Sequence, residues 1–549
     1  MASRISPWRS FNEFFVSIVY FVQGSAGLTS IAMAIILREQ LGLDFYQMGL
    51  IGVASTLPWS IKPIFGLLTD LVPIGKYRRR PYLHIGPLLG FLGYLIIGVY
   101  GNSFEVFFLA LIFANLGLSL TDVATDGFVV EESDEKNAAR IQGITQASIR
   151  MAAFITSFFS GLLIYAEVLT PHQMFLLVAC FPLMTFLASF FIREKKVDSL
   201  SSDPKPAASI SLEAKAEYQQ TKKFDVSVFT KGYIASLIVI FILIILNLVF
   251  GSKIDSLLAE HVPQLSRIYF TIAIWALFGV WMASYFTKLK KLKLTSSMIF
   301  VAILFILLWR INPGTGNSTF FYLKDILGIN EKTLGFIDTI SQLGSILGVV
   351  LAVKIFDKIR LKKLLVATVL IAAVYGFSSF AVTHPEWGNW LGTTSIVSFF
   401  GSLIAVPVYF FDSIFNSLFV GTAFANPITT AFSLSSMEKY LYLQSIIGEL
   451  VFMIAYIPLL KFAVLITPKK AEATNFAIIT SIMNVGLAVS TWLSGYLYNF
   501  FMLQYYPDLP VTTIQVDIID LLIWINIITS ATCLLVLPFL KTERFVKES

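Results

Sequence analysis

The sequence predicts an all-α polytopic membrane protein made of two six-helix halves, with two further helices between them. Three observations support this prediction: an apolar composition, a succession of apolar runs long enough to cross a bilayer, and an internal repeat. The 549 residues are 56% hydrophobic and 13% charged, with a mean hydropathy of +0.77, whereas soluble domains carry about 25% charged residues. This composition excludes a soluble domain.

Apolar runs of about 20 residues, the length that crosses a bilayer as a helix, follow one another along the chain. The first run is too long for the apolar core of a signal peptide, so we expect it to be retained as a helix. The predicted spans lie at about residues 13–37, 47–70, 83–101, 104–130, 139–166, 172–192, 231–250, 267–287, 297–323, 331–356, 362–383, 392–433, 440–466, 474–501 and 514–540.

The runs divide the chain into four regions. Residues 1–192 are predicted to form the first six-helix half, and residues 296–549 the second. The polar stretch at 193–230 is expected to be a flexible linker, because it is too rich in charge to bury a core. Residues 231–295 are predicted to contain two inserted transmembrane helices.

An internal repeat relates the two predicted halves. The motif Leu-Arg-Glu-Gln-Leu-Gly that ends at Gly42 resembles Leu-Lys-Asp-Ile-Leu-Gly ending at Gly328, an offset of 286 residues (328 − 42). Later in each half, the helix around Gly161 matches the helix around Gly495, an offset of 334 (495 − 161). Two six-helix halves in parallel repeat are typical of transporters of the major facilitator type.

The difference between the two offsets means that the second half has gained 48 residues (334 − 286). They fall within residues 385–437, an inserted apolar hairpin. Its run at 392–433 must cross the membrane zero or two times, because the positively charged loops already determine the side of each flank. We expect a re-entrant or two-helix hairpin.

Lysine and arginine gather at every second boundary between predicted spans, as at Lys76–Arg80, Arg193–Lys196 and Lys288–Lys293. The intervening loops near Asn102 and His384 are poor in positive charge. By the positive-inside rule, both termini and the linker are expected in the cytoplasm, and a bacterial host would place the protein in its inner (plasma) membrane. The net charge of +6 therefore reflects topology and does not indicate a nucleic-acid partner.

Ionisable residues inside the apolar runs are the candidates for function. Asp122 and Asp126 lie four residues apart on one face of the predicted fourth helix. A charge in a spanning helix costs about 2.5–3.5 kcal/mol on insertion scales, so both carboxylates should face the bundle interior. Lys62 and Arg150 lie at comparable depth by helix rise, which predicts one cluster of these residues. Two neighbouring carboxylates rarely both ionise, so one is a candidate for proton coupling.

Two further ionisable residues are candidates in the second half. Arg310 stands in Trp-Arg-Ile-Asn-Pro, at the position that matches Gly24 (310 − 286). A proline there predicts that the helix breaks near a cavity, since unwound backbone in a membrane must be buried in protein or line water. Glu449, in a later helix, is an isolated acidic candidate.

Each candidate also has a structural interpretation. Asp122 and Asp126 could belong to salt bridges that only hold helices together. Lys62 could extend its ammonium toward the interface as membrane lysines do. Arg150 could pair with an aspartate rather than a solute. Aromatic residues in such a chain face lipid or pack against one another, although stacking on a ligand ring is an alternative.

The segment between the second and third predicted helices resembles the loop signature of the major facilitator superfamily. It consists of Gly66-Leu-Leu-Thr-Asp70, followed by the basic turn Arg78-Arg79-Arg80. The resemblance implies that Gly66, Asp70 and the three arginines act in gating and in fixing the sidedness of the chain, rather than in binding a solute.

Longer patterns resemble the folate–biopterin transporter family. They are Lys62-Pro63, Pro73-Ile74-Gly75 and Arg79-Arg80-Pro81-Tyr82 around the loop, Asp122-Val-Ala-Thr-Asp126 in the fourth helix, and Glu472-Ala473 with Thr480-Ser481-Ile482 in the second half. Gly127 departs from the pattern, because alanine is commoner there. The resemblance implies a secondary active transporter of folate, biopterin or another pteridine, with protons and the lipid bilayer as its other partners.

A pterin ring presents paired N–H groups that one carboxylate can accept side by side. A folate adds a glutamate tail, for which Lys62, Arg150 or Arg310 could supply positive charge. We expect a monomer that is not an enzyme and that needs no cofactor, metal or nucleic acid.

Other functions remain open at this point. A facilitator of S-adenosylmethionine, a nucleotide or a cell-wall fragment would share the fold, because fold does not determine substrate. An intramembrane prenyltransferase would use Asp122 and Asp126 as half of a magnesium–diphosphate site, but no second acidic cluster stands at matching spacing. A scaffold or sensor would not need buried ionisable residues.

Overall fold

The computed structural model describes residues 7–132, 135–194, 298–356, 361–465 and 472–539, and scattered positions between 236 and 287. In these ranges every extended regular element is a helix, and the β-structure is limited to one isolated bridge between Ile74 and Tyr77. Ten of the described helical segments are long and apolar enough to cross a membrane. The chain is thus an all-α, multi-pass integral membrane protein, as the composition predicts. The predicted linker and the two inserted helices lie almost entirely outside the described residues.

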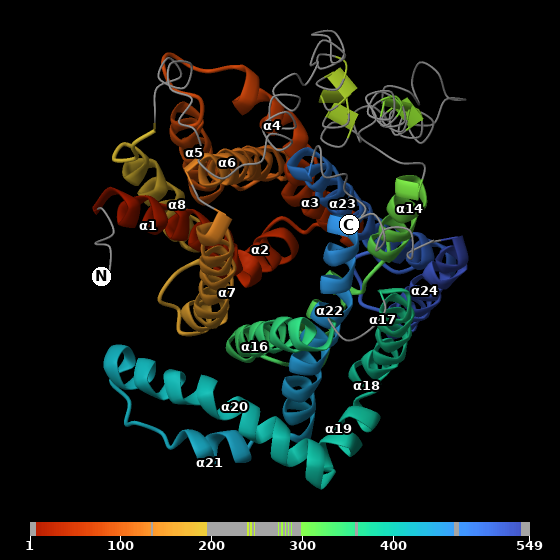
Figure 1. The fold of residues 1–549 in the computed structure, drawn as a ribbon. Helices are drawn as coiled ribbons and strands as arrows, with labels where there is room; N and C mark the ends of the chain where they lie inside the picture. The colour runs from red at the N-terminus through yellow and green to blue at the C-terminus, as the bar shows by residue number, and fades with distance from the viewer. Residues whose placement is uncertain are drawn as a thin grey trace, which may run out of the picture.

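The first part of the chain, residues 7–194, forms one group of packed helices (Figure 1). Aspartate and threonine residues begin two of them: Asp44 and Thr170 each form a reciprocal capping box, with Gln47 and Gln173. The elements are α1 (Pro7–Gly24), η1 (Ser25–Thr29), α2 (Ser30–Ile35), η2 (Ile36–Gln40), α3 (Phe45–Ser60), α4 (Lys62–Leu71), α5 (Arg80–Tyr100), α6 (Phe104–Glu132), α7 (Glu135–Tyr165) and α8 (Pro171–Ser189).

The second part, residues 298–539, contains longer helices and the insertion. Its elements are α14 (Met298–Arg310), α15 (Gly316–Phe321), η4 (Tyr322–Ile326), α16 (Glu331–Phe356), α17 (Leu361–Gly376), η5 (Phe377–Ser379), α18 (Phe380–Thr383), α19 (Pro385–Thr393), α20 (Ser395–Phe415), η6 (Asn416–Val420), α21 (Pro427–Phe432), α22 (Ser436–Leu465), α23 (Glu472–Tyr505), α24 (Val516–Val536) and η8 (Leu537–Phe539).

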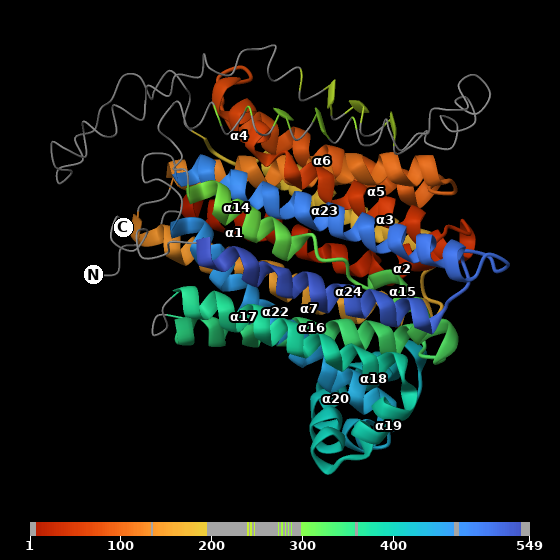
Figure 2. The ribbon, with the colours of Figure 1, turned by 90° about the vertical axis from the view of Figure 1, so that its right-hand side faces the viewer.

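Most long helices run side by side along one axis (Figure 2). The first residues of α1 and the last of α24 lie at the same end of this bundle, which we call the terminal end. The opposite end, where α3 and α16 begin, is called the distal end. Which end faces the cytoplasm stays a prediction, as does the division of the helices into two halves.

Two helices are interrupted at corresponding positions. The first changes at Gly24 from α1 to the 3₁₀ turn η1, and α14 ends at Arg310, 286 residues later. The π-helical turns η2 and η4, at residues 36–40 and 322–326, also differ by 286. The predicted break at Arg310 is therefore confirmed, and the sequence repeat extends to local irregularities that often mark functional sites.

Side chains satisfy the backbone that this break exposes. The carbonyl oxygens of Asn312 and Gly314 accept hydrogen bonds from Ser490 (2.5 Å) and from Ser494, both on α23. The carbonyl of Pro313 accepts one from Asn526 on α24 (3.0 Å). These partners explain how unwound backbone is tolerated at membrane depth, because unpaired carbonyls there cost several kcal/mol each.

Glycines bring helices of the two parts into close contact near the distal end. A β-carbon on Gly161 of α7 would lie 1.9 Å from the carbonyl oxygen of Glu331, the first residue of α16. A β-carbon on Gly495 of α23 would lie 2.0 Å from the carbonyl oxygen of Phe45, the first residue of α3. We call these two backbone contacts the distal contacts. Only glycine permits such an approach.

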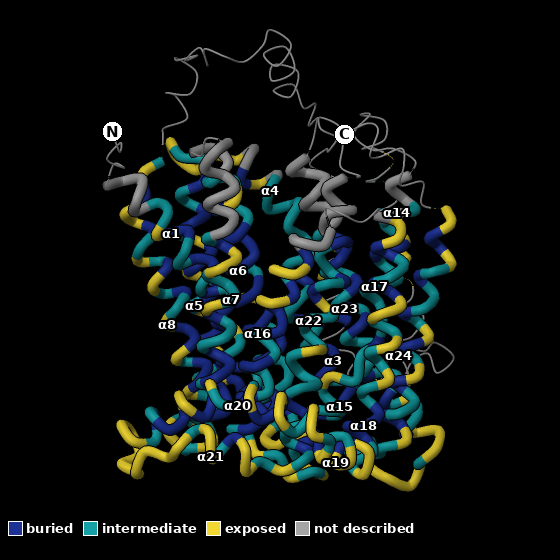
Figure 3. The backbone as a smooth tube through the Cα atoms, turned by 60° about the horizontal axis from the view of Figure 1, so that its bottom comes forward, coloured by how far each residue is buried: buried dark blue, intermediate teal, exposed yellow. Residues whose placement is uncertain are grey.

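The insertion contains a helix that lies across the bundle rather than along it. Figures 1 and 3 show α20 running across the distal end, where it packs on α16 and α22. Whether residues 392–433 form the predicted hairpin, with zero or two crossings, stays a prediction. The helix α20 is long and apolar enough to span a membrane. Its residues Val408 and Tyr409 are buried, whereas Phe399 and Phe410 are exposed.

Candidate functional site

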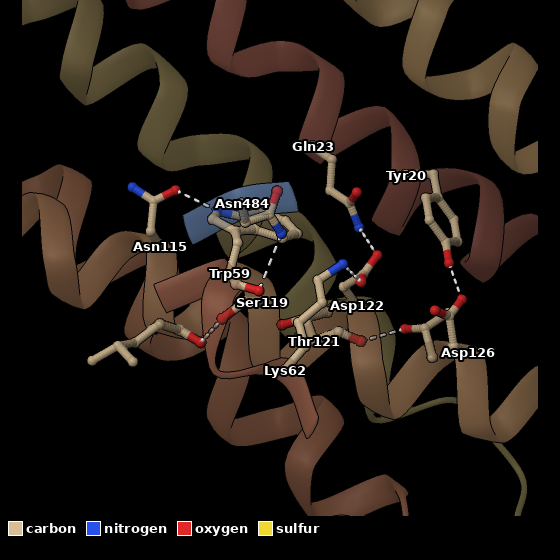
Figure 4. Close-up of polar contacts among 12 residues, drawn as sticks. Tyr20, Gln23, Trp59, Lys62, Asn115, Ser119, Thr121, Asp122, Asp126 and Asn484 are labelled. Carbon is tan, nitrogen blue, oxygen red and sulfur yellow. Dashed lines mark hydrogen bonds and ion pairs between the residues drawn. The ribbon is translucent and has the colours of Figure 1, made fainter. Parts of the chain in front are cut away.

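The central polar site is built around an ion pair between α4 and α6 (Figure 4). The helix α3 ends at Ser60, and α4 begins at Lys62 with a proline in its first turn. The ammonium of Lys62 lies 2.5 Å from Oδ2 of Asp122, and their side chains are 20% and 5% exposed. The structure thus brings together two of the predicted site residues in a desolvated pair.

The other oxygen of Asp122 is also occupied. Gln23 on α1 donates a hydrogen bond from Nε2 to Oδ1 of Asp122 over 2.7 Å. The ammonium of Lys62 lies 4.7 Å from the centre of the Trp59 ring, a cation–π distance. Both oxygens of this buried carboxylate therefore have protein partners.

Asp126 lies one turn further along α6 and has a different environment. Its carboxylate accepts a hydrogen bond from the hydroxyl of Tyr20 on α1. The residue is exposed, in contrast to Asp122, which is 4% exposed. The two predicted carboxylates are thus not equivalent: Asp122 belongs to a closed network, and Asp126 stays accessible to protons and solutes.

This network extends to the second part of the chain. The indole N–H of Trp59 donates to Oδ1 of Asn115 on α6 (3.0 Å), and Asn484 on α23 donates to the carbonyl of Trp59 (3.2 Å). Figure 4 shows Asn484 beside Trp59, with Lys62 and Asp122 further along. A helix from each part of the chain therefore contributes to one site.

Arg150 and Glu449 form a second cluster. Arg150 on α7 donates to the hydroxyl of Ser345 on α16 over 3.2 Å, and Ser345 donates to Oε2 of Glu449 on α22 over 3.1 Å. The described hydrogen-bond contacts of Arg150 are thus with Ser345 and Met453. That Arg150 shares one cluster with Lys62 and Asp122 stays a prediction.

Arg310 occupies a third position, at the break of α14. Its Nε donates to the carbonyl oxygen of Met483 on α23 over 3.3 Å. Its guanidinium lies 5.9 Å from the ring of Trp309 and 5.8 Å from the ring of Tyr456. The described contacts of Arg310 are thus with a carbonyl group and with aromatic faces.

The predicted gating segment is anchored at its arginines. Arg79 is buried and donates from Nη1 to the hydroxyl of Thr69 over 2.5 Å. A β-carbon on Gly127 would lie 2.4 Å from Cζ of Arg79, so the glycine leaves room for the guanidinium. Gly66 and Asp70 lie in α4, where a β-carbon on Gly66 would meet only Val123 at 4.0 Å. The side chain of Asp70 lies outside the described residues.

Glu194 holds the same segment from the other side. Its carboxylate accepts the backbone N–H groups of Arg78, Arg79 and Arg80 over 3.0, 2.8 and 2.8 Å. The guanidinium of Arg80 also donates to the carbonyl of Phe190 (2.9 Å). A carboxylate at the first turn of α5 satisfies free N–H groups and the positive end of the helix dipole.

Sequence reasoning did not find several residues of this site, namely Tyr20, Gln23, Trp59, Asn115 and Glu194. One signal was available: Asn115, Ser119, Asp122 and Asp126 recur at helical spacing and form a polar stripe on an apolar helix. Glu194 gave no such signal, because it stands in a charged stretch that reads as linker. Among the described residues, no three His, Cys, Asp or Glu side chains come together as a metal site would need.

Solved structures show the class of fold. The chain resembles a D-xylose–proton symporter (TM-score 0.53, 11% identity, covering 96% of this chain and 97% of that one). It also resembles a POT family transporter solved with 5-aminolevulinic acid (TM-score 0.55, 16% identity, 96% of each chain). The protein therefore has the fold of the major facilitator transporters, as the repeat predicts.

The chain belongs to the BT1 family, whose model matches residues 23–384 and 403–548. A folate-biopterin transporter of Synechocystis is 25% identical over 527 residues, which cover 95% of this chain and 79% of the relative. Folate transporter 1 of Plasmodium falciparum is 23% identical over 370 residues, or 67% of this chain and 57% of the relative. The protein is thus a membrane transporter and not an enzyme.

Proposed function

We propose that this protein is a secondary active transporter that moves folate, biopterin or a related pteridine by alternating access and couples this movement to protons. The observation that supports it most is the pairing of a closed ion pair, Lys62–Asp122, with an accessible carboxylate, Asp126, one turn away. The names of the relatives supply the class of substrate.

The accessible carboxylate suits the chemistry of a pterin. A pterin ring carries adjacent N–H donors, and a carboxylate accepts two such donors side by side. Asp126 can still accept such donors, because Tyr20 is its one hydrogen-bond partner among the described residues and Asp126 is exposed. The same carboxylate can take up and release a proton, which is what proton coupling requires of an acidic residue inside the bundle.

Two structural features support alternating access. The helices that contain Gly24 and Arg310 are interrupted at corresponding positions, as in transporters whose substrate lies near the midplane. The distal contacts at Gly161 and Gly495 join helices of the two parts at one end of the bundle. Rocking of the two parts would open these contacts.

The proposal includes an orientation and a gate. The positive-inside rule places both termini, and with them the terminal end, in the cytoplasm. The segment with Gly66, Asp70 and Arg78 to Arg80 then lies on the cytoplasmic side and acts as a gate, working as part of a monomer. Glu194, which follows α8, ties this gate to the end of that helix.

Uptake into vesicles tests the proposal. Purified protein in liposomes should accumulate labelled folate or biopterin when the outside is acidified, and less so when a protonophore collapses the gradient. Asp126→Asn should abolish the response to the gradient, because an amide cannot exchange a proton. Vesicles could instead take up neither compound but accumulate S-adenosylmethionine or a nucleotide from the same panel. That result would refute the proposed pteridine substrate and leave the assignment as a transporter in place.

A further inference from the structure

Three aromatic rings form a wall beside Arg310. Trp309 of α14 lies 5.8 Å from Phe452 and 6.3 Å from Tyr456, both on α22, and Phe452 lies 5.6 Å from Tyr456. Their planes differ by only 13–29°. We call Trp309, Phe452 and Tyr456 the aromatic wall. Nearly parallel rings present flat faces, and such faces favour offset stacking with another flat ring.

The wall faces the polar site rather than standing apart from it. Phe452 and Tyr456 follow Glu449 on α22 at spacings of three and seven residues, so the three share a helix face. Glu449 accepts a hydrogen bond from the hydroxyl of Ser345. The same hydroxyl accepts a hydrogen bond from Arg150 of the first part of the chain. The wall therefore continues the face of α22 on which Glu449 is linked to Arg150 of the first part.

The three cations of this region differ in their partners. Lys62 is neutralised by Asp122 at 2.5 Å. Arg150 is linked through Ser345 to Glu449.

Arg310 has only uncharged partners in the part of the chain that the structure describes: the Met483 carbonyl and the rings of Trp309 and Tyr456. Its residue is half-buried, so its remaining N–H groups are within reach of a solute.

Neighbouring residues of α23 also determine the position of Arg310. A β-carbon on Gly486 of α23 would lie 2.6 Å from the β-carbon of Arg310, so glycine lets α23 approach the break. The bond to the Met483 carbonyl then directs the guanidinium along the wall. A planar guanidinium with free N–H groups beside flat rings is suited to a carboxylate carried on an aromatic ring, which it binds with two parallel hydrogen bonds.

We propose that Arg310 and the aromatic wall form the subsite for an aromatic carboxylate, such as the benzoyl-glutamate portion of a folate. This inference rests on the proposed function. It assigns to Arg310, rather than to Lys62 or Arg150, the recognition of the glutamate tail. Arg310 then determines selectivity between folates, which carry that carboxylate, and biopterin, which does not.

A pair of matched ligands tests the subsite: 4-aminobenzoyl-glutamate and its diamide, which have the same ring and differ in the carboxylates. In wild-type protein the acid should inhibit pteridine uptake at least tenfold more strongly than the diamide. Arg310→Gln should remove this difference, raise KM for folate about tenfold and leave biopterin uptake within about twofold. Arg310→Lys should be intermediate, because lysine keeps the charge but not the planar fork.

Phe452→Leu provides the control for the wall. It should weaken the acid and the diamide equally, because it removes stacking and leaves the charge of Arg310 in place. An Arg310→Gln protein that keeps its preference for the acid, or that loses folate and biopterin uptake to the same extent, would overturn the assignment of Arg310.

Binding separates this inference from the proposed function. If wild-type vesicles transport no pteridine, the acid and the diamide are compared by their effect on thermal unfolding of the purified protein. Stabilisation by the acid in wild type but not in Arg310→Gln would support the subsite although the proposed function had failed. Equal effects of the two ligands on wild type would refute the subsite.

Discussion

The distal contacts and the central ion pair hold helices together by opposite means: the distal contacts join the two parts of the chain, and the ion pair joins α4 and α6 of the first part. At Gly161 and Gly495, backbone lies against backbone, and the absence of a side chain is what matters. At Lys62 and Asp122, the contact consists of charged side chains. The first region should therefore be sensitive to added volume and insensitive to charge. The second should be sensitive to charge and tolerant of a change that removes both charges together.

The largest effect is expected when the central ion pair loses one partner. Lys62→Met leaves Asp122 buried without its cation, and such a change costs about 3–5 kcal/mol. We expect a large loss of thermal stability and of uptake. The double variant Lys62→Met with Asp122→Leu should recover much of the stability but none of the uptake. Thermal unfolding and vesicle uptake of the three proteins check this, and additive losses would refute the coupling.

A smaller effect is expected at the distal contacts. Gly161→Val places a side chain against the Glu331 carbonyl, where a β-carbon already lies at 1.9 Å, and overpacking costs about 1–3 kcal/mol. Uptake should fall at least tenfold, because the distal contacts cannot form. Gly314→Ala is the matched control, since nothing lies within 4 Å of its β-carbon. Normal uptake by Gly161→Val would show that transport does not need this contact.

Gly127→Ala tests a contact that combines volume and charge. The new methyl group would lie 2.4 Å from Cζ of Arg79 and displace the guanidinium from Thr69. We expect a loss of about 1 kcal/mol in stability and a fall of a few fold in uptake. Gly66→Ala, on the facing helix, should change uptake less than twofold, because its nearest neighbour is 4.0 Å away. Equal effects of the two substitutions would contradict this explanation.

The smallest effect is expected at Glu194. Glu194→Gln keeps one carbonyl acceptor for the N–H groups of Arg78, Arg79 and Arg80 but removes the negative charge. A loss of about 0.5–1 kcal/mol is expected, at the low end of the range for helix caps. A melting curve of the purified protein measures it. Glu194→Ala should cost more, and a variant as stable as wild type would show that the cap contributes nothing.

The sequence predicted features that depend on one helix at a time. The break at Arg310 followed from a proline and a repeat, and the buried position of Asp122 followed from the cost of a charge in an apolar helix. The sequence alone could not predict which helices face one another. The contact of Arg150 with Ser345 therefore could not be predicted, because helix rise gives depth and not rotation.

Two further features depend on tertiary contacts in the same way. The helix α20 has the length and hydropathy of a spanning helix, and only its contacts with α16 and α22 show that it lies across the bundle. Glu194 and Arg79 are 115 residues apart in sequence, so their contact depends on tertiary structure. The aromatic wall was not predicted because phenylalanine and tyrosine serve equally for packing and for lipid contact.

The orientation of α20 has a mechanical consequence. This helix occupies area at one end of the bundle, with Phe399, Phe410 and their neighbours exposed to the surroundings. A helix that lies flat with an apolar face against lipid contacts one leaflet. Lys332 of α16 holds Asp412 of α20 at 3.2 Å, and α16 begins with Glu331, the residue that touches Gly161. A force on α20 would thus be passed through α16 to the distal contacts, and uptake measured in vesicles of different lipid composition tests this coupling.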